Sequence, residues 1–145
     1  MKADTLNLKI KSQTEKLHLV REFVSDAARN FGFDEDSAGN IALAVDEACT
    51  NVIKHSYEFA SNNDIEIGIL TTNGKFEVII TDQGKGFNPE AIQAPDMREY
   101  LNAYKKGGLG MYLMKSLMDK VEYTIAQGKK NEVRLTKFLP VKVAR

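Results

Sequence analysis

Three polar residues recur at intervals of four in the segment LAVDEACTNVIKHSY, residues 43–57. They are an acid, an amide and an imidazole: Glu47, Asn51 and His55. A spacing of four places side chains along one side of an α-helix, about 6 Å apart in rise per step. The three groups could therefore converge on one ligand. The alternative is an ordinary solvated helix face.

The apolar residues of the same segment indicate which of these groups borders the core. On a helical wheel one stripe is formed by Ile41, Val45, Ala48 and Val52, and Glu47 and Asn51 fall at its border. A carboxylate in that position can have a shifted pKa, or can orient a metal ion and water. His55 lies nearer the apolar side, so we interpret it as a structural residue at the helix end.

The segment TDQGKGFNP, residues 81–89, supplies a second group. Asp82 ends a β-rich run and is followed by Gly84 and Gly86, whose backbones allow a ligand to approach the chain closely. A planar base could lie there, and an aspartate can accept a hydrogen bond from the exocyclic amino group of adenine, where guanine presents a carbonyl. The alternative is an ordinary Asp-Gly turn.

A glycine-rich segment, KKGGLGM at residues 105–111, precedes a helical pattern. Backbone N–H groups at a helix N-terminus form an anion site, and Lys105 and Lys106 add positive charge. This predicts phosphate binding, although the segment matches neither the Walker A pattern nor GxGxxG. A flexible hinge is the alternative. The connection from Asn88 to Lys106 is interpreted as either a mobile lid or a poorly ordered loop.

Two periodicities alternate along the chain. Period-two runs predict strands over 5–11, 64–70, 75–81, 121–127 and 132–138, the middle pair joined as a hairpin at 72–74. Spacings of three and four predict a helix capped by Ser12 or Thr14 and ended at Gly32, a second from residues 34–36 to about Phe59, and a third over 108–119. We expect an α+β, two-layer sandwich: a mixed, mainly antiparallel sheet of about five strands with helices on one face.

Composition restricts the class of protein. The 145 residues fit a single domain, 1–145, and the 20 basic and 20 acidic residues cancel. No global field is therefore available to attract nucleic acid or an anionic membrane. One cysteine, Cys49, excludes an internal disulfide, and no segment has the roughly 20 apolar residues of a membrane span. A cytoplasmic protein is expected.

Taken together and in order, the motifs DEACTNVIKH, DQGKGF and GGLGMYLM resemble the nucleotide-binding boxes of the GHKL ATPase superfamily. The chain is most similar to its small anti-sigma-factor serine/threonine kinases, from about Leu6 to Leu139. The resemblance implies the Bergerat ATP-binding fold, with ATP or ADP and Mg²⁺ as ligands. It also implies two protein partners, a small anti-sigma-factor antagonist that is phosphorylated and a sigma factor that is sequestered. A homodimer is expected.

The resemblance also implies a role for each matching position. Asn51 would hold Mg²⁺ against the phosphates, and Glu47 would orient or deprotonate the attacking hydroxyl. Asp82 would bind the adenine amino group. The remaining cofactor-binding positions would line the base or the phosphates: Gly84, Gly86, Lys105, Lys106, Gly108, Leu109 and Gly110.

Two positions depart from the family pattern. Lys105 and Lys106 stand where an arginine is common, and lysine lacks the bidentate fork. Asn131 and Glu132 stand where the last strand often begins with Gly-Thr, which predicts the loss of one nucleotide-facing hydroxyl. Two alternatives therefore stay open: a nucleotide-dependent binding module without phosphoryl transfer, and the catalytic half of a split histidine kinase.

Overall fold

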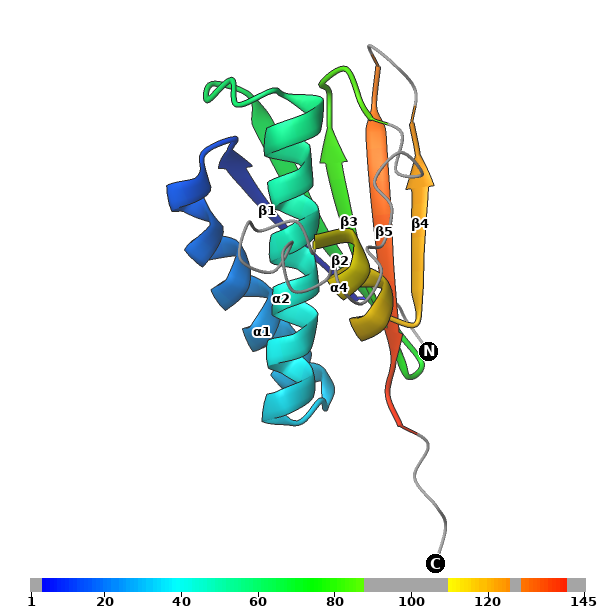
Figure 1. The fold of residues 1–145 in the computed structure, drawn as a ribbon. Helices are drawn as coiled ribbons and strands as arrows, with labels where there is room; N and C mark the ends of the chain where they lie inside the picture. The colour runs from blue at the N-terminus through cyan, green and yellow to red at the C-terminus, as the bar shows by residue number, and fades with distance from the viewer. Residues whose placement is uncertain (1–3, 88–109, 126–128, 141–145) are drawn as a thin grey trace, which may run out of the picture.

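The structure, a computed structural model, describes residues 4–87, 110–125 and 129–140. Its strands are β1 (Asp4–Lys11), β2 (Asp64–Thr72), β3 (Lys75–Asp82), β4 (Lys120–Thr124) and β5 (Asn131–Phe138). They form one sheet in the order β1-β2-β3-β5-β4. Three helices cover one of its faces: α1 (Leu17–Phe31), α2 (Glu35–Asn51) and α4 (Gly110–Leu117) (Figure 1). The α+β two-layer prediction is confirmed. Every strand pair that the structure describes is antiparallel, so the sheet is not mixed.

The sheet follows from the alternation of apolar and polar residues. One face packs against the helices, and its fully buried side chains are Ile65, Ile67, Ile69, Phe76, Val78, Ile80 and Leu135. The predicted hairpin is confirmed: β2 and β3 pair through Thr72 and Lys75, and Gly74 has a φ of 68° in the turn. Positive φ is the reason that glycine suits this position.

The first helix begins later than predicted. A 3₁₀ turn covers Thr14–Lys16, α1 covers Leu17–Phe31, and neither N-terminus has a side-chain cap. Ser12 does not cap because its hydroxyl donates instead to the carbonyl oxygen of Ala60, across the sheet edge. The predicted end is confirmed at Gly32, whose φ of 125° favours glycine.

Helix α2 (Glu35–Asn51) carries the segment of greatest chemical interest. Asp34 caps it by accepting a hydrogen bond from the backbone N–H of Ser37 at 2.8 Å, and this bond lowers the pKa of the Asp34 carboxyl. The predicted core stripe is confirmed, with Ile41, Val45, Ala48 and Val52 all at 2% exposure or less. Cys49 is a free and fully buried cysteine, and burial raises the pKa of its thiol.

The prediction that this helix continues to about Phe59 is wrong. The α-helix ends at Asn51, and a π-helical turn over Val52–Ser56 is closed by a 2.9 Å bond from the Tyr57 N–H to the Val52 carbonyl oxygen. Glu58 and Phe59 then have positive φ values, which a right-handed helix does not allow. The wider turn changes which side chains face inward: Ser56 is buried, whereas His55 is exposed.

The chain returns through α4 (Gly110–Leu117) and β4. Both are shorter than the predicted spans of 108–119 and 121–127, parts of which lie outside the described residues. Met114 is fully buried and Leu117 packs against the core, as predicted; the side chain of Leu113 lies outside the description. None of the described helices combines the length and apolar character needed to cross a bilayer.

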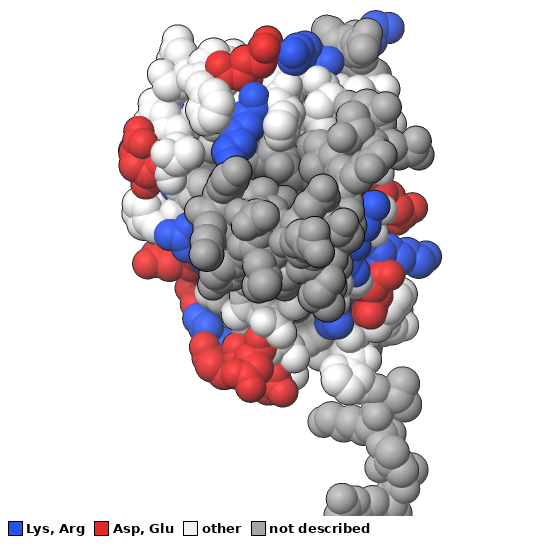
Figure 2. Space-filling model, in the orientation of Figure 1, with Lys and Arg blue, Asp and Glu red and all other residues white. Residues whose placement is uncertain are grey.

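Acidic and basic side chains are interspersed on the helix-covered face (Figure 2). Several are paired: Arg21 meets Asp46 at 2.6 Å, and Arg29 meets Glu35 at 2.9 Å. Each of these pairs brings two opposite charges together.

Candidate nucleotide site

Helix α2 places the predicted catalytic and metal-binding residues one turn apart near its C-terminus. Glu47 is half-buried, as expected for the border of the core stripe, whereas Asn51 is buried at 7% exposure. Both side chains offer oxygen atoms, the ligands that Mg²⁺ prefers. The arrangement suits a metal ion that completes its shell with phosphate oxygens.

The environment of Glu47 favours a proton acceptor. Burial raises the pKa of its carboxyl, the adjacent charge of Asp46 raises it further, and Lys54 opposes the shift. A carboxylate with a raised pKa is a better base near neutral pH than an ordinary surface glutamate. Arg21 holds Asp46 in place by an ion pair.

Asp82 lies at the end of β3, 4% exposed, and is the centre of a hydrogen-bond network. Its Oδ1 atom accepts from the hydroxyl of Ser56, from the backbone N–H of Gly84 at 2.9 Å and from Nδ2 of Asn131 at 3.0 Å. All of these bonds end on Oδ1. Within the described part of the chain, Oδ2 is therefore left to accept from a ligand.

Ser56 belongs to the candidate site through its bond to Asp82, and the sequence patterns do not predict this. Its hydroxyl accepts from the Gly86 N–H at 3.0 Å while donating to Asp82, and its carbonyl oxygen accepts from the Lys85 N–H at 3.1 Å. The π-helical turn after α2 thus holds the glycine segment that follows β3 in place through these hydrogen bonds. Only the π-helical turn brings Ser56 to that position, and no simple periodicity predicts such a turn.

Asn131 is the second residue whose part in the site was not predicted. It begins β5 directly opposite Asp82 in the strand register, and it is 1% exposed. Its Nδ2 donates to Asp82 and, at 3.0 Å, to the Gly84 carbonyl oxygen. From sequence, this position predicts the loss of a hydroxyl; the structure shows an amide bonded to Asp82 there.

The two glycines after Asp82 pack tightly against the protein itself. A Cβ atom on Gly84 would lie 2.6 Å from the carbonyl oxygen of Ser56, and one on Gly86 would lie 2.6 Å from Cγ2 of Ile125. Gly86 also has a φ of 76°. Both positions therefore require glycine for close approach of neighbouring segments, whether or not a base is bound.

We expect Gly84→Ala to destabilise the protein by about 1–3 kcal/mol, because its methyl group would meet backbone atoms that cannot move aside. The matched control is Gly39→Ala in the middle of α2, where a Cβ meets nothing within 4 Å. That substitution should stabilise the protein by about 0.5–1 kcal/mol through helix propensity. Denaturant unfolding measures both. A Gly84→Ala protein as stable as the parent would contradict the packing argument.

The second glycine segment lies mostly outside the described residues. This applies to Lys105, Lys106, Gly108 and Leu109, and to the predicted lid between residues 88 and 106. Gly110 is described as the first residue of α4, which agrees with a glycine segment leading into a helix N-terminus. Phosphate binding at this segment stays a prediction.

His55 does not lie toward the apolar side as predicted, because the π-helical turn directs it outward. Its ring packs against Phe87 at 5.6 Å between centroids. Partial burial and the charges of Lys54 and Lys85 lower the pKa of His55. Because Phe87 follows Gly86 directly in the chain, this ring contact joins His55 to the glycine segment.

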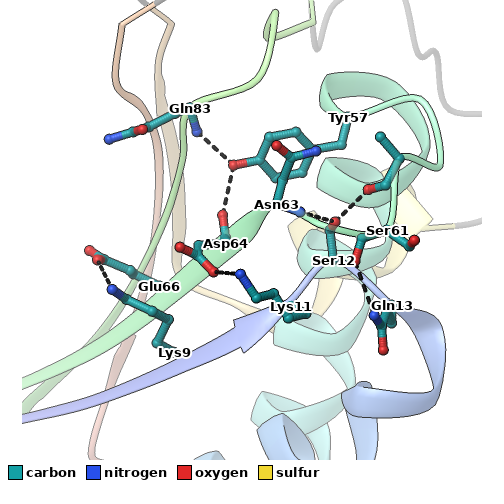
Figure 3. Close-up of polar contacts among 11 residues, drawn as sticks. Lys9, Lys11, Ser12, Gln13, Tyr57, Ser61, Asn63, Asp64, Glu66 and Gln83 are labelled. Carbon is teal, nitrogen blue, oxygen red and sulfur yellow. Dashed lines mark hydrogen bonds and ion pairs between the residues drawn. The ribbon is translucent and has the colours of Figure 1, made fainter.

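A pocket of about 440 Å³ opens near the start of β2 and the end of β3, beside Tyr57. The Tyr57 hydroxyl donates to the Asp64 carbonyl oxygen at 2.7 Å and accepts from the Gln83 N–H at 2.9 Å (Figure 3). Of the predicted site residues that the structure describes, only Asp82 lines this pocket. Glu47 and Asn51 on α2 do not line it.

The described residues contain no cluster of three or more histidine, cysteine, aspartate or glutamate side chains that could hold a metal ion alone. A divalent ion at Asn51 would consequently depend on oxygen atoms from a bound nucleotide. This is the usual situation for Mg²⁺ in phosphoryl-transfer sites.

Comparison with known proteins gives matches along nearly the whole chain. The family described as a histidine kinase-like ATPase domain matches residues 10–137. The serine-protein kinase RsbW of Bacillus subtilis is 32% identical over 142 residues, which cover 94% of this chain and 87% of that kinase. The serine-protein kinase RsbW of Listeria monocytogenes is 30% identical over 140 residues, covering 94% and 88%.

A solved structure shares the fold. Full-length ShkA in complex with AMPPNP aligns with 99% of this chain and 33% of its own length, with a TM-score of 0.53 and 14% identity. At that identity the likeness concerns the arrangement of the sheet and helices alone.

Proposed function

The chain belongs to the histidine kinase-like ATPase family, and on that premise we propose that it is an ATP-dependent serine/threonine protein kinase of the anti-sigma-factor type. The observation that carries the proposal is the Asp82 carboxylate: three donors bond its Oδ1, and among the described residues none bonds its Oδ2, which can accept from an exocyclic amino group. The relatives at 30–32% identity are serine-protein kinases, which supports the same activity.

Each residue has a defined part in the proposed reaction. Asp82 accepts a hydrogen bond from the adenine amino group of ATP or ADP, and Asn51 provides an amide oxygen for Mg²⁺. When bound, Mg²⁺ neutralises charge on the phosphates. Glu47 orients the hydroxyl of the protein substrate and accepts its proton, a part that its raised pKa favours. Lys105, Lys106, Gly108, Leu109 and Gly110 are proposed to contact the phosphates.

The proposed partners are proteins. A small anti-sigma-factor antagonist would be the phosphorylated substrate, and a sigma factor or comparable regulator would be sequestered when the antagonist is absent. We propose that residues 1–145 form one domain that carries out both tasks as a homodimer, without binding nucleic acid or a membrane.

Incubation of the protein with Mg²⁺, ATP and candidate antagonists tests the activity, with mass spectrometry of the antagonist as the readout. A phosphoserine or phosphothreonine on the antagonist supports the kinase. The second candidate is a nucleotide-dependent binding module, which Asn131 and Glu132 at the start of β5 favour because they depart from the family pattern. Binding of ATP and of the antagonist without phosphorylation would select the module.

We expect ATP and ADP to bind with Mg²⁺ and GTP to bind far more weakly, because guanine presents a carbonyl oxygen to the Asp82 carboxylate. Asp82→Asn should weaken binding of adenine nucleotides by roughly tenfold or more, since it replaces a charged acceptor. Calorimetry measures both affinities. Equal affinities of the parent protein for ATP and GTP would show that Asp82 does not select the base.

A further inference from the structure

We infer that Ser56 and Asn131 are positioning residues that set the base specificity of the site, an inference that rests on the proposed contact between Asp82 and adenine. They hold the Asp82 carboxylate in one orientation, with Oδ1 turned to the protein and Oδ2 turned to the base. Their own side-chain donors are used in these bonds. A 6-amino purine therefore finds an acceptor, and a 6-keto purine finds no donor from either residue.

Ser56 holds Asp82 from the side of α2. It is 3% exposed, and a hydroxyl has one hydrogen to donate, which Ser56 gives to Asp82 Oδ1. The Gly86 N–H at 3.0 Å occupies an acceptor position of the same hydroxyl. Rotation of the hydroxyl hydrogen toward a ligand would break the bond to Asp82.

Asn131 holds the same oxygen from the side of β5. An amide nitrogen has two hydrogens, and Nδ2 of Asn131 donates them to Asp82 Oδ1 and to the Gly84 carbonyl oxygen, each at 3.0 Å. Asn131 is 1% exposed, so its amide has little room to turn. A free amide at this position could donate to a 6-keto oxygen, and the two bonds prevent it.

The two side chains approach Asp82 from segments 26 and 49 residues away along the chain. Discrimination follows from the fixed carboxylate, because a keto oxygen facing Oδ2 leaves two acceptors unpaired and in contact. Removing either holder frees Asp82 to turn away from the keto oxygen, which relieves the repulsion. The amino group of adenine loses a well-placed acceptor at the same time.

The test compares ATP with inosine triphosphate, which replaces the 6-amino group by a 6-keto group, carries a hydrogen on N1 and is otherwise the same nucleotide. Calorimetry gives the dissociation constants of both nucleotides for the parent, Ser56→Ala and Asn131→Ala proteins. In each variant we expect the preference for ATP over inosine triphosphate to fall roughly tenfold, the size of one hydrogen bond to a charged group. Asn131→Thr keeps one donor and should give an intermediate preference.

Ser12→Ala is the matched control. Ser12 is 2% exposed, and its hydroxyl also donates to a chain oxygen, that of Ala60, and accepts from a backbone N–H, that of Asn63 at 3.2 Å (Figure 3). This control should lose stability as Ser56→Ala does and keep the preference of the parent protein. Stability alone would therefore not account for a changed preference.

The inference is overturned if Ser56→Ala and Asn131→Ala weaken both nucleotides by the same factor, since the two residues would then serve the fold only. That result differs from a failure of the proposed function. A parent protein that binds neither nucleotide would overturn both proposals. A parent that prefers ATP, loses the preference in Asp82→Asn and keeps it in the two alanine variants would overturn this inference alone.

Discussion

Replacing Glu47 by glutamine is expected to slow phosphorylation of the protein substrate by on the order of 10²–10⁴-fold while leaving ATP affinity nearly unchanged. Glutamine keeps the size and hydrogen-bonding capacity of the side chain but cannot accept the hydroxyl proton. Single-turnover transfer rates and nucleotide calorimetry on the same variant separate the two effects.

The folded state of the Glu47→Gln protein provides an internal check. Burial and Asp46 raise the pKa of Glu47, so its ionised form is destabilised in the folded protein, and stability decreases as pH rises through that raised pKa. Removing the charge should therefore leave the melting temperature at neutral pH unchanged or higher. Glu35→Gln, at the exposed start of the same helix, is the control and should transfer phosphate at the parent rate.

The pH dependence of the parent enzyme provides a second check. Because Glu47 must be ionised to accept a proton, transfer should fall as pH decreases through its raised pKa. Asp46→Asn removes one cause of the shift and should move this acid limb to lower pH. A Glu47→Gln protein that phosphorylates its substrate at the parent rate would contradict the assignment of Glu47 as the base and would favour the binding module.

Much of the fold could be predicted because its periodicities are undisturbed. Apolar and polar residues alternate in β2 from Asp64 to Ile69, and in β3 the fully buried Phe76, Val78 and Ile80 recur at intervals of two, which determines the buried face. The stripe of Ile41, Val45 and Ala48 likewise predicted the buried face of α2, and with it the half-buried position of Glu47. Local patterns were sufficient wherever the local structure is regular.

The residues that hold Asp82 could not be predicted, for two physical reasons. Ser56 faces the site only because one π-helical turn interrupts the regular helix, and a wheel of 100° per residue places His55 there instead. Asn131 meets Asp82 through strand pairing 49 residues away along the chain, and the register of β3 with β5 is a property of the whole sheet. Gly84 suggests a turn from sequence, but the clash that a Cβ atom on Gly84 would make with Ser56 is visible only in three dimensions.

The other large effect is expected at Asn51. Asn51→Ala should lower the affinity for ATP in the presence of Mg²⁺ by roughly 100-fold, which removes the gain that Mg²⁺ provides. The reason is that the loss of even an outer-shell partner of a metal ligand costs about 10–100-fold in metal affinity. Asn51 is 7% exposed and is the last residue of α2. ATP affinity is measured for the parent and the variant, each with Mg²⁺ and with a chelator.

The comparison between the solutions with Mg²⁺ and with the chelator isolates the contribution of the metal ion to ATP affinity. A metal ligand contributes only when Mg²⁺ is present, so the parent and Asn51→Ala proteins should bind ATP equally in the chelator and differ in Mg²⁺. Asn40→Ala, an exposed asparagine on the same helix, should behave as the parent in both solutions. If Asn51→Ala lowers ATP affinity by the same factor in Mg²⁺ and in the chelator, Asn51 supports the shape of the site. If Asn51→Ala keeps the full increase in ATP affinity that Mg²⁺ provides, Asn51 is not a metal ligand. The ion would then have to be held by the phosphates and Glu47.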